Sequence, residues 1–238
     1  KLEPAALAAA LDAPDHGVHH VRAAAVSLAQ ASEAGTVYTP DEVKAIADLA
    51  HGRGLKVHMD GARFANALAS LGCSPAEASC QAGVDILCLG ASKNGALAAE
   101  AVVVFDRGLA ETLAYRRKRG GHLFSKMRFL AAQFDAYLDG DLWLRLAGHA
   151  NAAAKRLATG LASLPGAAFR HAVEANEIFV ELPEPVIQGL LADGFSFYRW
   201  PGEGARLIRL VTAFDTRDAD VDAFVASARR HAGIPTAV

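Results

Sequence analysis

Apolar residues recur along the first two-thirds of the chain with two alternating periods, one typical of buried strands and one of helices. Four short apolar runs predict strands at 25–29, 55–59, 84–89 and 101–105. Thr39-Pro40-Asp41-Glu42 has the pattern of a capping box, which predicts a helix that ends at Gly52–Gly54. A second box, Ser74-Pro75-Ala76-Glu77, predicts a helix that ends at Gly83. Strands that alternate with helices indicate right-handed crossovers, and hence an α/β fold with a mostly parallel sheet and helices on both faces.

The pattern changes after about residue 125. Helical spacing of apolar residues predicts one helix near 129–138 and a longer one over 142–161. Beyond them, short strands are expected at 177–182 and 205–213, with helices near 185–192 and 216–232. We therefore expect two domains. Residues 1–140 would be part of a large α/β domain, and residues 141–238 a small C-terminal α+β domain.

Composition narrows the classes of function. With 52% hydrophobic residues, 24 basic and 26 acidic side chains and a net charge of −2, the chain has the composition of an ordinary soluble globular protein. This balance gives no reason to expect nucleic acid or a membrane as a partner. Cys73, Cys80 and Cys88 lack paired metal-ligand spacing, so we expect them to be reduced and buried, as in the cytoplasm.

Two ionisable residues follow neighbouring predicted strands. Asp60 ends the run at 55–59, and Lys93 comes just after the run at 84–89. Ligands of open α/β sheets gather outside the carboxyl ends of the strands. A pyridoxal phosphate enzyme needs this pair, because a lysine amine forms an imine with the cofactor aldehyde and a carboxylate keeps the pyridine nitrogen protonated.

Each of these residues also has a simpler interpretation. Lys93 could be a solvated loop lysine, and Asp60 could belong to an Asp-Gly turn or cap the next helix. Arg63, at the start of that helix, could be a surface arginine or could donate to a cofactor or substrate oxygen. Adjacent histidines at 16, 19 and 20 suggest a metal site, but a loop of neighbouring histidines is more often simply polar, so no metal is expected.

Four ordered motifs over nearly the whole chain resemble the low-specificity L-threonine aldolases and related β-eliminating lyases. They are His58 to Ala67, Ser92 to Phe105, Arg116 to Phe129 and Leu207 to Thr212. The resemblance implies a pyridoxal phosphate-dependent enzyme of fold type I, similar to aspartate aminotransferase in fold. It implies that Lys93 carries the cofactor as a Schiff base, Asp60 pairs with the pyridine nitrogen, Arg63 reaches the ring oxygen and Arg128 helps to bind the phosphate.

The resemblance also implies the reaction, in which a β-hydroxy-α-amino acid is cleaved to glycine and an aldehyde. Arg63 and Arg209 would hold the substrate carboxylate, although Arg209 could instead be an exposed charge at a strand edge. A histidine, His19 or alternatively His20, would take the hydroxyl proton. The remaining alternatives are a β-eliminating lyase of the same fold and an inactive remnant that serves for binding or dimerisation.

Members of this family carry a further segment before the point that corresponds to residue 1. We expect a chain without that segment to lose part of its sheet and to bind the cofactor poorly. By the same resemblance, the expected assembly is a homodimer or homotetramer, and the expected partner is a small amino acid substrate.

Overall fold

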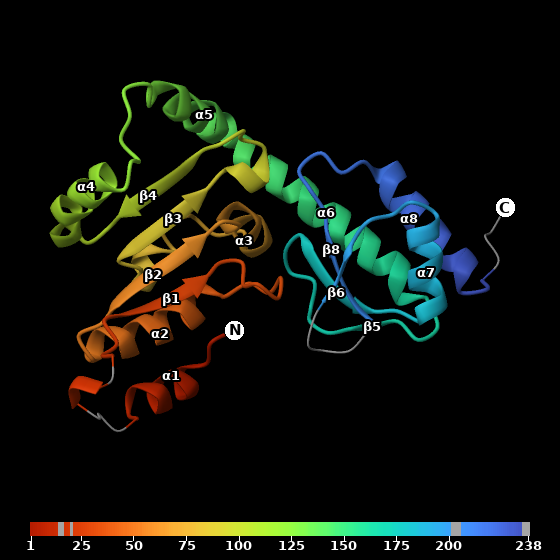
Figure 1. The fold of residues 1–238 in the computed structure, drawn as a ribbon, viewed down its shortest axis with the longest axis horizontal. Coiled ribbons are helices and arrows are strands. Elements are labelled where there is room, and N and C mark those ends of the chain that lie inside the picture. Colours follow the sequence, from red (N-terminus) through yellow and green to blue (C-terminus); the bar gives the residue numbers. More distant parts are fainter. Residues whose placement is uncertain (14–16, 20, 201–205, 235–238) are drawn as a thin grey trace. The chain divides into compact units, whose positions relative to one another are not determined.

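The computed structural model describes residues 1–13, 17–19, 21–200 and 206–234 (Figure 1). The chain divides into two units, which are described separately. The first comprises Lys1–Ser32 and Val37–Trp143, and the second comprises Glu33–Thr36 and Leu144–Val238. The assignment of 1–140 and 141–238 to a large and a small domain stays a prediction.

The first unit is built on a four-stranded sheet. Its strands are β1 (Ala25–Ala29), β2 (Lys56–Gly61), β3 (Ile86–Gly90) and β4 (Glu100–Val104), in that spatial order. The first three run parallel, as the alternating pattern predicts, whereas β4 pairs with β3 in the antiparallel direction. A parallel connection needs a crossover of about a dozen residues or more. The loop of residues 91–99 is too short for one, so the chain turns back on itself.

Helices α1 (Pro4–Leu11), α2 (Pro40–Gly52) and α3 (Phe64–Leu71) belong to the same unit. At the start of α2 the predicted capping box is confirmed. The Thr39 hydroxyl accepts a hydrogen bond from the Glu42 amide at 3.2 Å, and the Glu42 carboxylate accepts one from the Thr39 amide at 2.7 Å. The unit also contains α4 (Ala110–Arg119), α5 (Arg128–Leu138) and the 3-10 turns η1 (Gly17–His19), η2 (Cys80–Ala82), η3 (Ser92–Asn94), η4 (Arg107–Leu109) and η5 (Asp139–Asp141).

The helix predicted from Ser74 to Gly83 is wrong. The hydrogen bonds of its capping box form, with Glu77 accepting from the Ser74 amide at 2.8 Å, but they close only a turn that leads into η2. The Ser79 hydroxyl donates to the Pro75 carbonyl at 2.5 Å, and the backbone of Ser79 is non-helical (φ −136°, ψ −95°). A serine that bonds to its local backbone competes with helix propagation, and here that competition ends the helix after one turn.

The two faces of the sheet differ in exposure. One face is buried, and α2 and α3 both contact β2. Its residues include Val26, Leu28, Val57, Met59 and Leu87, all at most 6% exposed. On the other face the residues are half-buried or exposed, and Val102 is 50% exposed. The expected helical layer on this second face is not formed by the described residues, although parallel strands are normally covered on both sides.

The second unit is a small α+β layer. Its strands β5 (Ala168–Phe169), β6 (Glu177–Glu181), β7 (Tyr198–Arg199) and β8 (Leu207–Val211) form an antiparallel sheet in the order β5-β6-β8-β7. The unit includes α6 (Leu142–Ala162) from Leu144 onward, with α7 (Glu184–Ala192) and α8 (Asp218–His231). The main elements predicted after residue 140 are therefore confirmed. Fully buried side chains form its core, including those of Leu161, Ile178, Ile187, Leu190 and Ile208.

Among the described helices, none has both the length and the apolar character needed to cross a lipid bilayer.

Candidate active site

Lys93 lies in η3, the 3-10 turn that follows β3 directly, and its side chain is exposed. No contact within the described residues engages its amine. The next residue, Asn94, is only 3% exposed and anchors the turn. Its amide nitrogen Nδ2 donates to the Tyr137 hydroxyl at 2.7 Å and to the Trp143 carbonyl at 2.8 Å. The buried hydrogen bonds of Asn94 thus fix the backbone of the turn, while the amine of Lys93 has no partner among the described residues.

The remainder of this loop is also held by hydrogen bonds. The side-chain oxygen Oε1 of Gln133 accepts from the backbone amides of Leu97 and Ala98 at 3.0 and 3.1 Å, and the Ser92 hydroxyl accepts from the Ala99 amide at 3.2 Å. Gly95 takes a positive φ of 111°, which only glycine adopts without strain. Sequence reasoning noted the Asn-Gly turn but missed its anchors, because nothing in the sequence links the turn to a helix some forty residues away.

Asp60 lies near the end of β2, where its Cα pairs with that of Cys88 in β3. Its oxygen Oδ1 accepts a hydrogen bond from the Ala62 amide at 2.9 Å, so the Asp-Gly turn interpretation is part of the answer. No described residue binds the second oxygen, Oδ2. The carboxylate is exposed and oriented by the backbone, and it stands on the strand adjacent to the one that leads to Lys93.

A row of polar side chains crosses the sheet beside Asp60. The Ser27 hydroxyl lies 2.8 Å from Nδ1 of His58, and Nε2 of His58 lies 3.3 Å from the Cys88 sulfur. Burial raises the pKa of the Cys88 thiol, and the Asp60 and Glu100 carboxylates raise it further. A protonated thiol is a hydrogen-bonding group and a poor nucleophile. Sequence reasoning missed this row, although alternation along the strands places its members on one face.

Arg63 is the residue that precedes α3, and its side chain is half-buried. No side chain caps this helix, so the alternative that Asp60 acts as its cap is wrong. Three residues separate Arg63 from Asp60, and both lie on the segment that leaves the carboxyl end of β2. The arginine therefore belongs to the same edge of the sheet as the carboxylate.

The structure does not join Arg128 and His19 to this pair. Arg128 begins α5, is exposed, and stacks over the Phe129 ring at 4.7 Å from its centroid. His19 ends η1 and is exposed. None of the described contacts links either residue to Asp60 or Lys93. His20, the alternative base, lies outside the described residues.

Arg209, on β8 of the second unit, is part of an ion pair. Its Nε donates to Oε1 of Glu177 at 3.1 Å, and its Nη2 contacts the same oxygen closely. Its guanidinium carbon lies 5.6 Å from the centroid of the Trp200 ring. The side chain of Glu177 is fully buried, whereas that of Arg209 is 20% exposed. The alternative of an exposed strand-edge charge is therefore wrong, since this arginine is held by a buried carboxylate.

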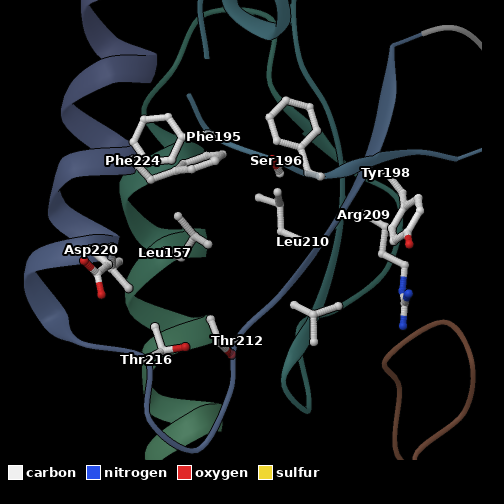
Figure 2. A pocket seen from close by; sticks show the side chains of 13 residues that line it. Leu157, Phe195, Ser196, Tyr198, Arg209, Leu210, Thr212, Thr216, Asp220 and Phe224 are labelled. Carbon is white, nitrogen blue, oxygen red and sulfur yellow. The ribbon is translucent and has the colours of Figure 1, made fainter. Parts of the chain in front are cut away.

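A hollow of about 610 Å³ opens beside this arginine within the second unit (Figure 2). Its walls are largely apolar, with Leu157, Phe195, Leu210 and Phe224 among them. Figure 2 shows the guanidinium of Arg209 directed away from the two phenylalanine rings. The charged group of Arg209 therefore points away from the apolar walls of the hollow.

The cysteines and histidines give no metal centre among the residues that the structure describes, where no group of three or more suitable ligands converges. Cys73, Cys80 and Cys88 are all free thiols. The expectation that all three are buried is wrong, since Cys80 is exposed and the other two are half-buried. Their positions next to turns and on the open face of the sheet explain this exposure.

Comparison with known proteins shows the family to which the chain belongs. Residues 1–184 match the family described as "Beta-eliminating lyase". The chain is 51% identical over 199 residues to a low specificity L-threonine aldolase of Pseudomonas aeruginosa, covering 84% of this chain and 57% of that protein. It is 44% identical over 230 residues to a low specificity L-threonine aldolase of a Pseudomonas species, covering 96% of this chain and 65% of the relative.

A solved structure of threonine aldolase from Leishmania major is also similar. Its TM-score is 0.89 at 28% sequence identity, over 98% of this chain and 68% of that one. The expected fold type I is therefore confirmed. The chain spans only 57% and 65% of the length of the two curated relatives that it matches.

Proposed function

We propose a pyridoxal phosphate-dependent aldolase function for this chain, which belongs to the beta-eliminating lyase family. In the proposed reaction a β-hydroxy-α-amino acid such as threonine is cleaved to glycine and an aldehyde. One observation carries the proposal. Lys93, whose amine has no partner among the described residues, comes just after β3, and Asp60, which has one carboxylate oxygen without a described partner, lies near the carboxyl end of the adjacent parallel strand β2.

The side chains present at this edge suit pyridoxal 5'-phosphate. Oδ1 of Asp60 is taken by the Ala62 amide, which leaves Oδ2 to pair with a protonated ring nitrogen. The exposed amine of Lys93 is accessible to an aldehyde, and Asn94 fixes the backbone that carries it. When bound, the cofactor supplies an aldehyde that captures the substrate amine and a ring that accepts electrons.

The remaining side chains would bind and orient the substrate. Arg63 would donate to the ring oxygen and to the substrate carboxylate, and Arg209 would also bind that carboxylate. Arg128 would contribute to phosphate binding. His19 would take the proton from the substrate hydroxyl as the Cα–Cβ bond breaks, and Cα would then take up a proton to give glycine.

Lysine replacement tests the proposal. The protein is incubated with pyridoxal phosphate, treated with borohydride and digested, and the modified peptide is identified by mass. The label is expected on Lys93 and should be absent from Lys93→Ala, which should also lose threonine cleavage. Lys118→Ala, which removes an exposed lysine of α4, is the matched control and should behave as the parent. Retained aldolase activity in Lys93→Ala would refute the assignment.

Product analysis separates the alternatives. Glycine and acetaldehyde from threonine support the aldolase, whereas pyruvate and ammonia from a substrate with a leaving group at Cβ would indicate β-elimination, the chemistry for which the family is named. A protein that folds cooperatively but takes no label would be a binding or dimerisation module. The free cysteines support the proposal of a cytoplasmic location. We also propose a homodimer or homotetramer, which the mass in solution would test.

A further inference from the structure

Glu177 is an unusual residue to be buried on a strand of the second unit. Its side chain is fully buried, although it lies on the face of β6 opposite to the one through which Ile178 and Val180 join the apolar core. The Glu33–Thr36 segment packs closely upon it, since a Cβ added at Gly35 would lie 2.8 Å from the Glu177 carbonyl oxygen. A buried ionised carboxylate is costly unless it is paired, and an apolar residue would often serve stability as well.

The pairing of Glu177 with Arg209 follows from strand register. Glu177 is paired with Val211 and Arg209 with Phe179, so the two charged residues are diagonal neighbours on one face of the sheet. The carboxylate engages Nε and Nη2, which form one edge of the guanidinium. Trp200 lies against the guanidinium at 5.6 Å. One edge and one face of the group are therefore fixed.

A second, adjacent edge of the guanidinium is left available. A guanidinium has five N–H donors, and the two contacts to Glu177 use two of them. No described residue bonds to Nη1 of Arg209, whose side chain is 20% exposed. The Nη1–Nη2 edge has the forked geometry that matches a second carboxylate.

We propose that Glu177 is a positioning residue, which orients Arg209 so that the Nη1–Nη2 edge of its guanidinium receives the substrate carboxylate. This proposal rests on the role of Arg209 in the proposed function. The competing account is that the two side chains only neutralise each other within the fold. The two accounts assign the effect of Glu177 to different properties. Positioning of Arg209 depends on where the carboxylate oxygen of Glu177 lies, whereas neutralisation depends only on its charge.

Two substitutions separate position from charge. Glu177→Asp keeps the charge but withdraws the carboxylate by one methylene. Glu177→Gln removes the charge but keeps an oxygen acceptor at the same reach. Glu181→Gln, at the other end of β6 and without a described contact to Arg209, is the matched control. Neither test variant opens a large cavity, so both are expected to fold.

The first measurement is independent of activity. Hydrogen exchange of the Arg209 Nε–H is followed by ¹⁵N NMR, with the signal assigned from its loss in Arg209→Lys. We expect a protected Nε–H in the parent protein, in Glu177→Gln and in the control. Exchange should be about tenfold faster in Glu177→Asp, where the acceptor is withdrawn.

The second measurement is steady-state cleavage of threonine. Glu177→Asp is expected to raise KM by about tenfold with little change in kcat, because carboxylate binding is shared by the ground and transition states. Glu177→Gln should stay within about threefold of the parent KM. Inhibition by threoninol, which lacks the carboxylate, should be the same in all variants.

The outcomes are distinguishable. If both variants keep the parental KM and Nε–H exchange and lose only stability, or if Glu177→Gln is the more impaired in binding, the positioning role is overturned. If the parent protein shows no cleavage but its Nε–H is protected and exposed by Glu177→Asp, the positioning role is supported and the proposed function fails. Cleavage with unaltered Nε–H exchange in Glu177→Asp would overturn the positioning role alone.

Discussion

Replacement of Asn94 by alanine tests whether the lysine-bearing turn is held from within. The amide of Asn94 donates two hydrogen bonds to buried acceptors, at 2.7 Å to Tyr137 and at 2.8 Å to Trp143. Each bond contributes about 1 kcal/mol net, and a buried acceptor that loses its donor costs about 1–3 kcal/mol. We expect Asn94→Ala to lower the free energy of unfolding of the first unit by about 2–4 kcal/mol. Tyr137→Phe, which removes one acceptor, should cost about 1 kcal/mol.

The assay exploits the two tryptophans of the chain. In a Trp200→Phe background only Trp143, which is 7% exposed in the first unit, remains to report unfolding by its fluorescence. Urea titrations analysed by linear extrapolation then give the change in free energy for Asn94→Ala, for Tyr137→Phe and for the double variant. A loss below about 0.5 kcal/mol in Asn94→Ala would refute the reasoning, because two buried hydrogen bonds cannot be removed at so small a cost.

Two further predictions concern other parts of the second unit. Hydrogen bonds and charge from Arg199 lower the pKa of Glu184 from 4.5 to about 2. This ion pair therefore stabilises the fold above pH 4.5, and its contribution is lost as the pH falls toward 2. Glu184→Gln should flatten the decline of Tm between pH 4.5 and 2, and an unchanged decline would contradict this prediction. Gly35→Ala should lower Tm more than Gly54→Ala. Both glycines have a positive φ (74° and 72°), but only at Gly35 would the new Cβ meet a neighbour, the Glu177 carbonyl oxygen at 2.8 Å. Equal losses of Tm would show that backbone conformation alone sets the cost of the substitution.

Local patterns predicted much of the fold. The strand at 25–29 and the capped helix from Pro40 form where the sequence predicts them, and the strand predicted at 84–89 forms at 86–90, because burial period and capping chemistry act over a few residues. Strand order then follows from the crossover rule, so the neighbouring positions of Asp60 and Lys93 were also predictable. The candidate site depends on these local signals and on the family motifs.

Other features depend on interactions that no local pattern contains. The direction of β4 is set by the length of the loop before it, and the helix expected from Ser74 fails because Ser79 bonds to its own turn. The expected role of Arg209 came from resemblance alone, since its partner Glu177 lies 32 residues away. Register between β6 and β8 brings the two together, and register is set by the packing of the whole sheet.

Three charged residues of the proposed site are held in place by nearby hydrogen bonds. Lys93, Asp60 and Arg209 each expose part of a charged group, and each is fixed by a hydrogen bond on its own or on the adjacent residue. The fixing group is a backbone amide in one case and a nearly inaccessible side chain, Asn94 or Glu177, in the other two. A polar side chain enters an apolar core at a cost unless its hydrogen bonds repay it. Buried polar residues therefore mark places where the fold holds a surface group in a fixed geometry. Here Asn94 adjoins Lys93 in the chain and Glu177 binds Arg209, the lysine and the arginine that the proposed chemistry requires.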